Sequence, residues 1–219
     1  MPASPSSADS AVFTDRLLLA SLIAGVSYLI PVFLHLSGPA IIAWKGLGVG
    51  LLALYAVQRA SNRAGWLLAV VLALGAAGDV VLDIHFAVGA GLFALGHIVA
   101  VTLYMQNRRA PADRQTGVAV LLLVMVPAIS WMLTKRPDVL FYSGLLGAMA
   151  AAAWQSHFSR ARVGLGAIAF AVSDLLIFGR FGPLQGEIWV GPAIWTLYYA
   201  GQYNIATGVT QALARGDRA

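Results

Sequence analysis

Long apolar runs separated by short polar segments make up most of this chain. A helix needs about 20 apolar residues to cross a bilayer. The pattern predicts such spans at residues 17–36, 40–58, 66–84, 87–105, 117–134, 138–156, 163–180 and 190–211. Because lipid cannot satisfy the polar groups of irregular backbone, we predict an all-α membrane protein, a bundle of about eight transmembrane helices.

The joints between these spans decide the domain organisation. Residues 1–15 are rich in Ser, Ala and Pro and lack the basic start of a signal peptide, so they predict a short disordered N-terminal tail. No joint is long enough to separate two domains, so residues 16–213 form one eight-helix domain and residues 214–219 a short tail. The words Gly78-Asp79-Val80-Val81-Leu82 and Ser173-Asp174-Leu175-Leu176-Ile177 are similar, which favours a parallel repeat of four plus four spans.

Composition supports the membrane interpretation. Of the 219 residues, 59% are hydrophobic and 11% are charged, whereas soluble domains carry about 25% charged residues. The net charge of +5 comes from basic residues scattered between apolar runs, so we expect no nucleic-acid partner. The absence of cysteine excludes disulfides, zinc thiolates and thiol nucleophiles.

The basic residues also predict an orientation, because Lys and Arg concentrate in cytoplasmic loops. With eight spans, one side holds nine of them and the other side three: Arg59, Arg63, Arg108, Arg109, Arg114, Arg160, Arg162, Arg215 and Arg218 against Lys135, Arg136 and Arg180. We therefore predict that both termini are cytoplasmic, in an integral protein of a bacterial inner (cell) membrane.

Several ionisable or polar residues fall inside the predicted spans. A charged side chain near the bilayer centre costs about 2.5–3.5 kcal/mol, so those that persist usually face the bundle interior. With roughly 1.5 Å of rise per residue, they lie in the outer-to-middle third of five helices: Lys45, Asp79, Asp83, His97, Asp174, Tyr198, Tyr199 and Gln202. One shared polar cavity is the simplest explanation.

Asp79 and Asp83 are four residues apart and therefore share a helix face. Two carboxylates so close in a low dielectric cannot both ionise cheaply, which predicts a proton donor beside an ionised partner. Lys45, if it reaches them, would favour the ionised form of one.

Structural alternatives remain open at each position. Lys45 could extend to the interface, and Asp83 could end its helix there. Asp79 and Asp174 could be hydrogen-bonding partners between helices. His97 could be a satisfied interior histidine, and the tyrosines could belong to an interfacial aromatic belt.

Other chemical motifs are missing from the sequence. It has no Gly-x-Ser-x-Gly turn, no histidine pair at metal spacing and no Gly-rich phosphate loop. We therefore expect no cofactor and no metal, although Asp79, Asp83, His97 and Asp174 would be the ligands if a metal were bound.

In order and spacing, these polar words resemble the YhhN-like lysoplasmalogenase family of small eight-span membrane proteins. The resemblance runs from about Lys45 to Gln202 and rests on Lys45, Gly78-Asp79 with Asp83, Gly96-His97 followed by Tyr104, Ser173-Asp174-Leu175-Leu176, and Tyr198-Tyr199 with Gln202. The sequence departs from the family at Trp44-Lys45-Gly46, where the family tends to have Pro after Lys.

The resemblance implies hydrolysis of the vinyl ether bond of lysoplasmalogens to a fatty aldehyde and a glycerophospho-base, with a lysophospholipid substrate and membrane lipids as partners. The residues suit that chemistry, because vinyl ether cleavage needs an acid for the β-carbon and an anion near an oxocarbenium ion. We expect Asp79 and Asp174 to form the acid and base pair, which Asp83 tunes or joins. The residues expected to position water or substrate are Lys45, His97, Tyr199, Gln202, Tyr198 and Ser173.

Two other classes of function remain open. A transporter or proton-coupled carrier would use the same intramembrane aspartates and a parallel repeat. A non-enzymatic lipid-binding protein would tolerate their loss.

Overall fold

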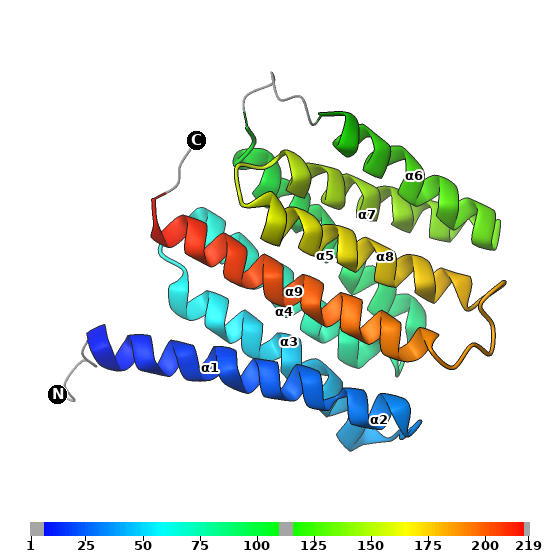
Figure 1. Cartoon of the computed structure of the whole chain (residues 1–219), viewed down its shortest axis with the longest axis horizontal. Coiled ribbons are helices and arrows are strands. Elements are labelled where there is room, and N and C mark those ends of the chain that lie inside the picture. Colours follow the sequence, from blue (N-terminus) through cyan, green and yellow to red (C-terminus); the bar gives the residue numbers. More distant parts are fainter. Residues whose placement is uncertain (1–6, 110–115, 217–219) are drawn as a thin grey trace.

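Helices form almost the whole of the described chain in the computed structural model, which describes residues 7–109 and 116–216. Figure 1 shows α1 (Ser7–Ser27), α2 (Leu29–Phe33), α3 (Pro39–Arg59), α4 (Arg63–Leu82), α5 (Phe86–Gln106), α6 (Thr116–Thr134), α7 (Pro137–Gln155), the π-helical turn η1 (Arg160–Gly164), α8 (Leu165–Gly179) and α9 (Val190–Ala214). The described residues contain no strand, only an isolated bridge between Arg108 and Ser156. The predicted all-α class is confirmed.

The apolar runs end where local signals favour a helix terminus. Proline begins α3 and α7, at Pro39 and Pro137, where its missing N–H is no loss. Asn62 caps α4, since its Oδ1 accepts a hydrogen bond of 2.9 Å from the backbone N–H of Gly65. Such signals explain why, from the second predicted span onward, the predicted spans and the observed helices agree to within a few residues.

Within the part of the chain that the structure describes, six segments are long and apolar enough to cross a membrane: Arg16–Phe33, Pro39–Arg59, Arg63–Leu82, Phe86–Gln106, Thr116–Thr134 and Arg160–Gly179. The less apolar helices α7 and α9 run among them in the same bundle (Figure 1). Both bury much of their surface, and α9 places Tyr198, Gln202 and Thr210 inside the protein. These features fit an integral membrane protein.

The start of the chain differs from the prediction. Helix α1 begins at Ser7, so residues 7–15 are helical and the predicted tail of residues 1–15 was wrong there. Ser and Asp are favourable in the first turn of a helix, a preference that the prediction of a disordered tail did not include. The described residues do not include 1–6, 110–115, where Arg114 lies, or 217–219.

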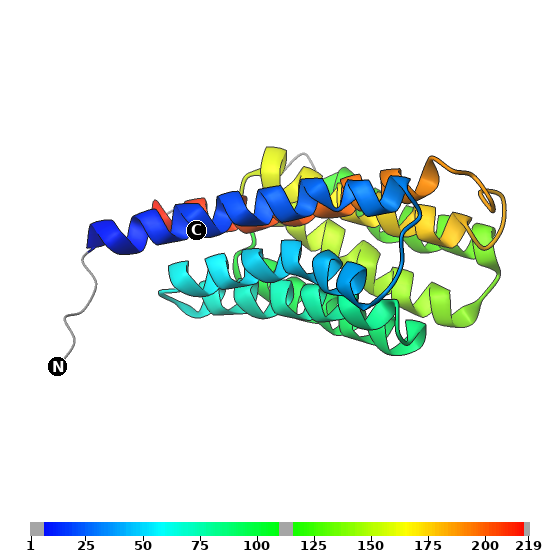
Figure 2. The ribbon, with the colours of Figure 1, turned by 90° about the horizontal axis from the view of Figure 1, so that it is seen from below.

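Consecutive long helices run in alternate directions, so the start of α1 and the end of α9 lie at the same end of the bundle (Figure 1). Figure 2 shows the first turns of α1 projecting beyond the neighbouring helices at that end. The same end carries the arginine-rich joints after α3 and α7. That it faces the cytoplasm stays a prediction, as does the repeat of four plus four spans.

Close backbone packing brings α8 against α9. A Cβ added at Gly201 would lie 2.6 Å from the carbonyl oxygen of Gly166, and one added at Gly166 would lie 2.9 Å from that of Gly201. Small residues at such crossings let membrane helices approach closely. This contact fixes the position of Asp174 on α8 relative to Tyr198 on α9.

Candidate active site

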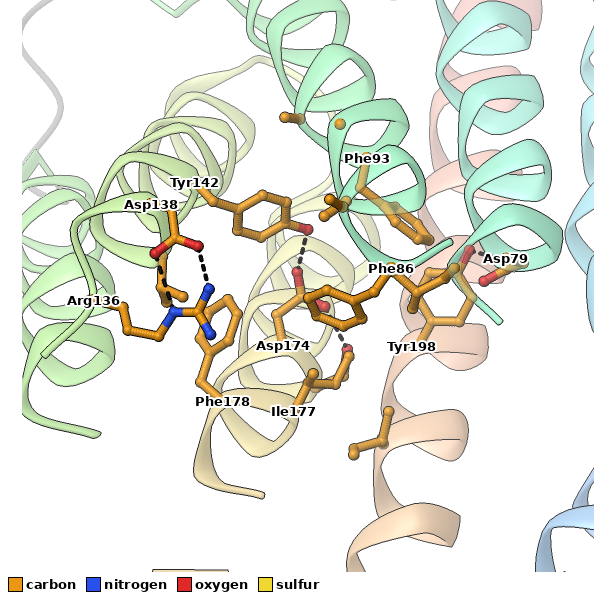
Figure 3. A pocket seen from close by; sticks show the side chains of 18 of the residues that line it. Asp79, Phe86, Phe93, Arg136, Asp138, Tyr142, Asp174, Ile177, Phe178 and Tyr198 are labelled. Atoms are coloured by element: carbon orange, nitrogen blue, oxygen red, sulfur yellow. Dashed lines mark hydrogen bonds and ion pairs between the residues drawn. The ribbon is translucent and has the colours of Figure 1, made fainter. Parts of the chain in front are cut away.

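A cavity of about 400 Å³ lies among α3, α4, α5, α7, α8 and α9, near the end of the bundle opposite the chain termini. Most of its lining is apolar, and Figure 3 shows the side chains of Phe86, Phe93 and Phe178 around it. The charged side chains in the lining are Lys45, Asp79, Arg136, Asp138 and Asp174. Of the residues predicted for the site, the lining contains Lys45, Asp79, Ser173, Asp174 and Tyr198.

Asp79 lies in the last turn of α4 and is only 2% exposed. The hydroxyl of Tyr198 donates a hydrogen bond of 2.7 Å to Asp79 Oδ2 (Figure 3). One turn further along α9, Gln202 Nε2 lies 3.5 Å from that hydroxyl and donates to it. The Asp79 carboxyl group is therefore held by a tyrosine that is itself oriented by an amide.

Asp174 has a matching arrangement on α8. The hydroxyl of Tyr142, from α7, donates a hydrogen bond of 2.7 Å to Asp174 Oδ2 (Figure 3). His97 Nε2, from α5, lies 3.2 Å from the Tyr142 hydroxyl. Because the tyrosine proton is directed at Asp174, the tautomer of His97 with its proton on Nε2 donates to the phenol oxygen. Ser173 Oγ lies 3.5 Å from Asp174 Oδ1 and donates its shorter bond, 2.8 Å, to the Phe170 carbonyl.

Lys45 and Asp83 form an ion pair of 2.7 Å at the rim of the cavity. Asp83 is the C-terminal cap of α4 and its side chain is 36% exposed, whereas that of Lys45 is 15% exposed and lines the cavity. Asp83 thus ends its helix, as the interfacial alternative proposed, and its carboxylate pairs with Lys45. Of the two residues, Lys45 belongs to the cavity lining and Asp83 does not.

The other predicted positions lie behind the cavity wall or away from it. Tyr199 is turned toward α1, where its hydroxyl lies 2.9 Å from Ser21 Oγ and its ring stacks on Trp195. It is outside the cavity lining. His97 and Gln202 line a separate space of about 20 Å³, and each contacts the tyrosine that holds one of the two aspartates.

Tyr142 contacts both Asp174 and His97 but was not among the residues predicted for the site. A signal was present: Tyr142 lies about one and a half turns into α7, at the same depth as Lys45 in α3. It was overlooked because a neutral tyrosine has no obvious cost in a membrane span. Arg136 and Asp138 also line the cavity, although Arg136 had been counted only as a loop residue and Asp138 only as the first residue of the span 138–156.

The described ranges contain no group of three His, Asp or Glu side chains that could hold a metal ion. Asp79 and Asp174 have separate tyrosine partners, and Asp83 is paired with Lys45. The four residues considered as metal ligands in the sequence therefore contact different partners.

Comparison with curated proteins and with solved structures gave no match. A family model does match, over residues 40–209, and that range contains every charged residue of the cavity lining. The match covers more than half of the chain and agrees with the resemblance carried by the polar words of the spans. This protein therefore belongs to the YhhN family.

Proposed function

We propose that this protein hydrolyses the vinyl ether bond of single-chain ether lysolipids, of the lysoplasmalogen type, to a fatty aldehyde and a glycerophospho-base. The observation that carries the proposal is that two buried carboxyl groups, each with its own tyrosine donor, line one apolar cavity inside a membrane bundle. The resemblance of the polar words to lysoplasmalogenases of this family supports it.

The chemistry needs one acid, one base and one water. The acid protonates the β-carbon of the vinyl ether, whose C=C electron pair becomes the new C–H bond and leaves an oxocarbenium ion. The base takes a proton from water as the water oxygen bonds to the oxocarbenium carbon. The resulting hemiacetal then loses its hydroxyl proton, forms the C=O bond and breaks its bond to the glycerol oxygen, which gains a proton. The products are the aldehyde and the glycerol hydroxyl, with one water consumed.

The surroundings of the two aspartates favour different roles. The Asp174 carboxyl is buried, and its partners Tyr142 and Ser173 are neutral donors, which support the carboxylate that forms once an acid at this position has given up its proton. Asp79 shares the cavity wall with Lys45, whose positive charge favours a carboxylate there. We assign the acid to Asp174 and the base to Asp79.

The apolar lining suits the hydrocarbon chain of such a lipid. Helix α5 presents small residues to the cavity at Ala87, Ala90, Gly91 and Ala94. The cavity wall also reaches the lipid-facing surface, because the lining residues Phe86 and Phe141 are 49% and 72% exposed. A single chain can therefore lie between α5 and α7 with its far end among membrane lipids.

The test is mass-spectrometric detection of a fatty aldehyde after purified protein in detergent is given an alkenyl lysolipid. A transporter would release no aldehyde under these conditions, which lack a membrane gradient. We expect Asp79→Asn and Asp174→Asn each to lose nearly all activity while staying monodisperse, and the double variant to be little worse than either. The control is Glu187→Gln, an exposed acid outside the cavity lining. Wild-type protein that releases no aldehyde would refute the proposal, and substantial turnover in both single variants would make the aspartates structural.

A further inference from the structure

Arg136 and Asp138 form an ion pair at the outer rim of the cavity. Arg136 is the N-cap of α7 and Asp138 lies in the first turn. Arg136 Nε donates to Asp138 Oδ1 over 3.1 Å, and Arg136 Nη2 donates to Oδ2 over 2.6 Å (Figure 3). Both residues line the cavity, and their side chains are 56% and 65% exposed. The two side chains are therefore joined by two hydrogen bonds and are accessible to a ligand.

This pair can bind further groups without breaking. A guanidinium has five N–H donors and a carboxylate has about four acceptor positions. The contacts between Arg136 and Asp138 use two of each. Three donors of Arg136 are left to meet an anion, and the exposed negative charge of Asp138 can meet a cation beside it.

The charge balance of the cavity rim indicates which ligand fits. The two cations of the lining, Lys45 and Arg136, are each paired with a carboxylate, of Asp83 and Asp138 respectively. The negative charge of an anionic headgroup would find no unpaired cation among them. A zwitterionic headgroup would place its phosphate beside the cation and its ammonium beside the carboxylate of one ion pair.

Spacing along α7 links this rim to the candidate catalytic residues. Asp138 and Tyr142 are four residues apart on one helix face, with Cβ atoms roughly 5–6 Å apart, and Tyr142 donates to Asp174. In a glycerol lysolipid, three carbons separate the phosphate oxygen from the ether oxygen of the chain. A phosphate at the rim would therefore bring the vinyl ether close to Asp174.

We propose that Arg136 and Asp138 form the headgroup site of this protein, in which Arg136 binds the phosphate and Asp138 binds the cationic ammonium group of a zwitterionic lysolipid. The proposal rests on the proposed function for the class of lipid. The pair sets headgroup specificity and does not take part in proton transfer.

The experiment measures binding, so that it does not depend on hydrolysis. The probes are saturated alkyl ether lysolipids with a phosphocholine or a phosphoglycerol headgroup, and the alkylglycerol that lacks a phosphate. Each is titrated into the full-length protein in detergent by calorimetry. The variants are Arg136→Gln and Asp138→Asn. The matched control is Lys135→Gln, because Lys135 is the neighbouring cation, lies over the ring of Trp131 and is outside the cavity lining.

We expect Arg136→Gln to weaken phosphocholine binding roughly tenfold or more, as for a charged hydrogen bond, and to leave alkylglycerol binding unchanged. Asp138→Asn should lower the preference for phosphocholine over phosphoglycerol by about tenfold, because the variant loses the attraction between the Asp138 carboxylate and the quaternary ammonium. Lys135→Gln should bind all three probes as the wild type does.

Three results would overturn the headgroup site: an unchanged headgroup preference in both variants, an equal loss of alkylglycerol binding, or wild-type protein that binds none of the probes. The expected binding pattern without aldehyde release would leave the headgroup site standing and refute the hydrolysis. Aldehyde release with an unchanged headgroup preference would support the hydrolysis and refute the headgroup site.

Discussion

Replacing Tyr142 with Phe removes a single hydroxyl from the centre of the site. That hydroxyl donates to Asp174 over 2.7 Å and lies 3.2 Å from His97 Nε2. The ring itself should stay in place, because it packs edge-to-face against both His97 and Phe178. The variant therefore tests the hydrogen bond with little change in packing.

The size of the effect follows from the charge that forms on Asp174. As the acid transfers its proton to carbon, a carboxylate develops, and a hydrogen bond to a charged group contributes about 1.5–3 kcal/mol. If most of that stabilisation is realised only in the transition state, kcat falls roughly tenfold to a hundredfold while KM changes little. His97 Nε2 also loses a partner in the interior, which should lower the free energy of unfolding by about 1–3 kcal/mol.

The assay compares initial rates of aldehyde release by wild-type protein and Tyr142→Phe in the same detergent. Tyr203→Phe is the matched control, since Tyr203 is a tyrosine of α9 outside the cavity lining. In an Asp174→Asn background, adding Tyr142→Phe should cost little more, because the two side chains act as one unit. A Tyr142→Phe variant with wild-type kcat, or with an equal proportional loss in the Asp174→Asn background, would refute the assignment of Tyr142 as the residue that supports the acid.

Other predictions concern topology, the proton and the lipid chain. A reporter fused after Ala219 should be active in the cytoplasm, from the nine-to-three bias in basic residues; activity only outside the cytoplasm would contradict the predicted orientation. Hydrolysis in heavy water should place one deuteron on the carbon next to the new aldehyde, and an early-trapped product without deuterium would rule out acid catalysis at that carbon. Gly91→Leu should raise KM for a long alkenyl chain roughly tenfold, since its side chain displaces about two methylenes from the cavity. No heavy atom lies within 4 Å of a Cβ at Gly91 or at the control Gly117, so Gly117→Leu with the same increase in KM would contradict this location for the chain.

The fold could be predicted because the length and polarity of each apolar run determine a membrane helix with little help from its neighbours. Because the rise per residue is constant along a helix, the sequence also placed Asp79, Asp174 and Lys45 at one depth. Rotation about the helix axis was harder to predict. Tyr198 and Tyr199 are adjacent in sequence and equal in depth, yet one hydroxyl contacts Asp79 and the other contacts Ser21 on α1.

The partners of the aspartates depend on how helices pack, which the span pattern does not contain. Asp83 was expected beside Asp79 because of their spacing, but α4 ends at Leu82 and Lys45 of α3 attracts the Asp83 carboxylate. Arg136 and Asp138 lie in or next to a joint, so only the packing of α7 against the cavity reveals that they line it.

Because Phe86 and Phe141 of the cavity wall are exposed, the concentration of ligand that matters is its concentration in the lipid phase. A ligand that enters between α5 and α7 comes from the lipid phase, so occupancy follows its mole fraction among lipids or detergent and not its amount per litre of buffer. Adding inert detergent at a constant amount of ligand should then reduce occupancy, because it lowers that mole fraction. Diluting the whole sample with buffer at a constant ratio of ligand to detergent should leave occupancy nearly unchanged. The products of the proposed reaction would separate by the same partition. The aldehyde would stay in the bilayer, and the glycerophospho-base, having lost its only chain, would pass into water.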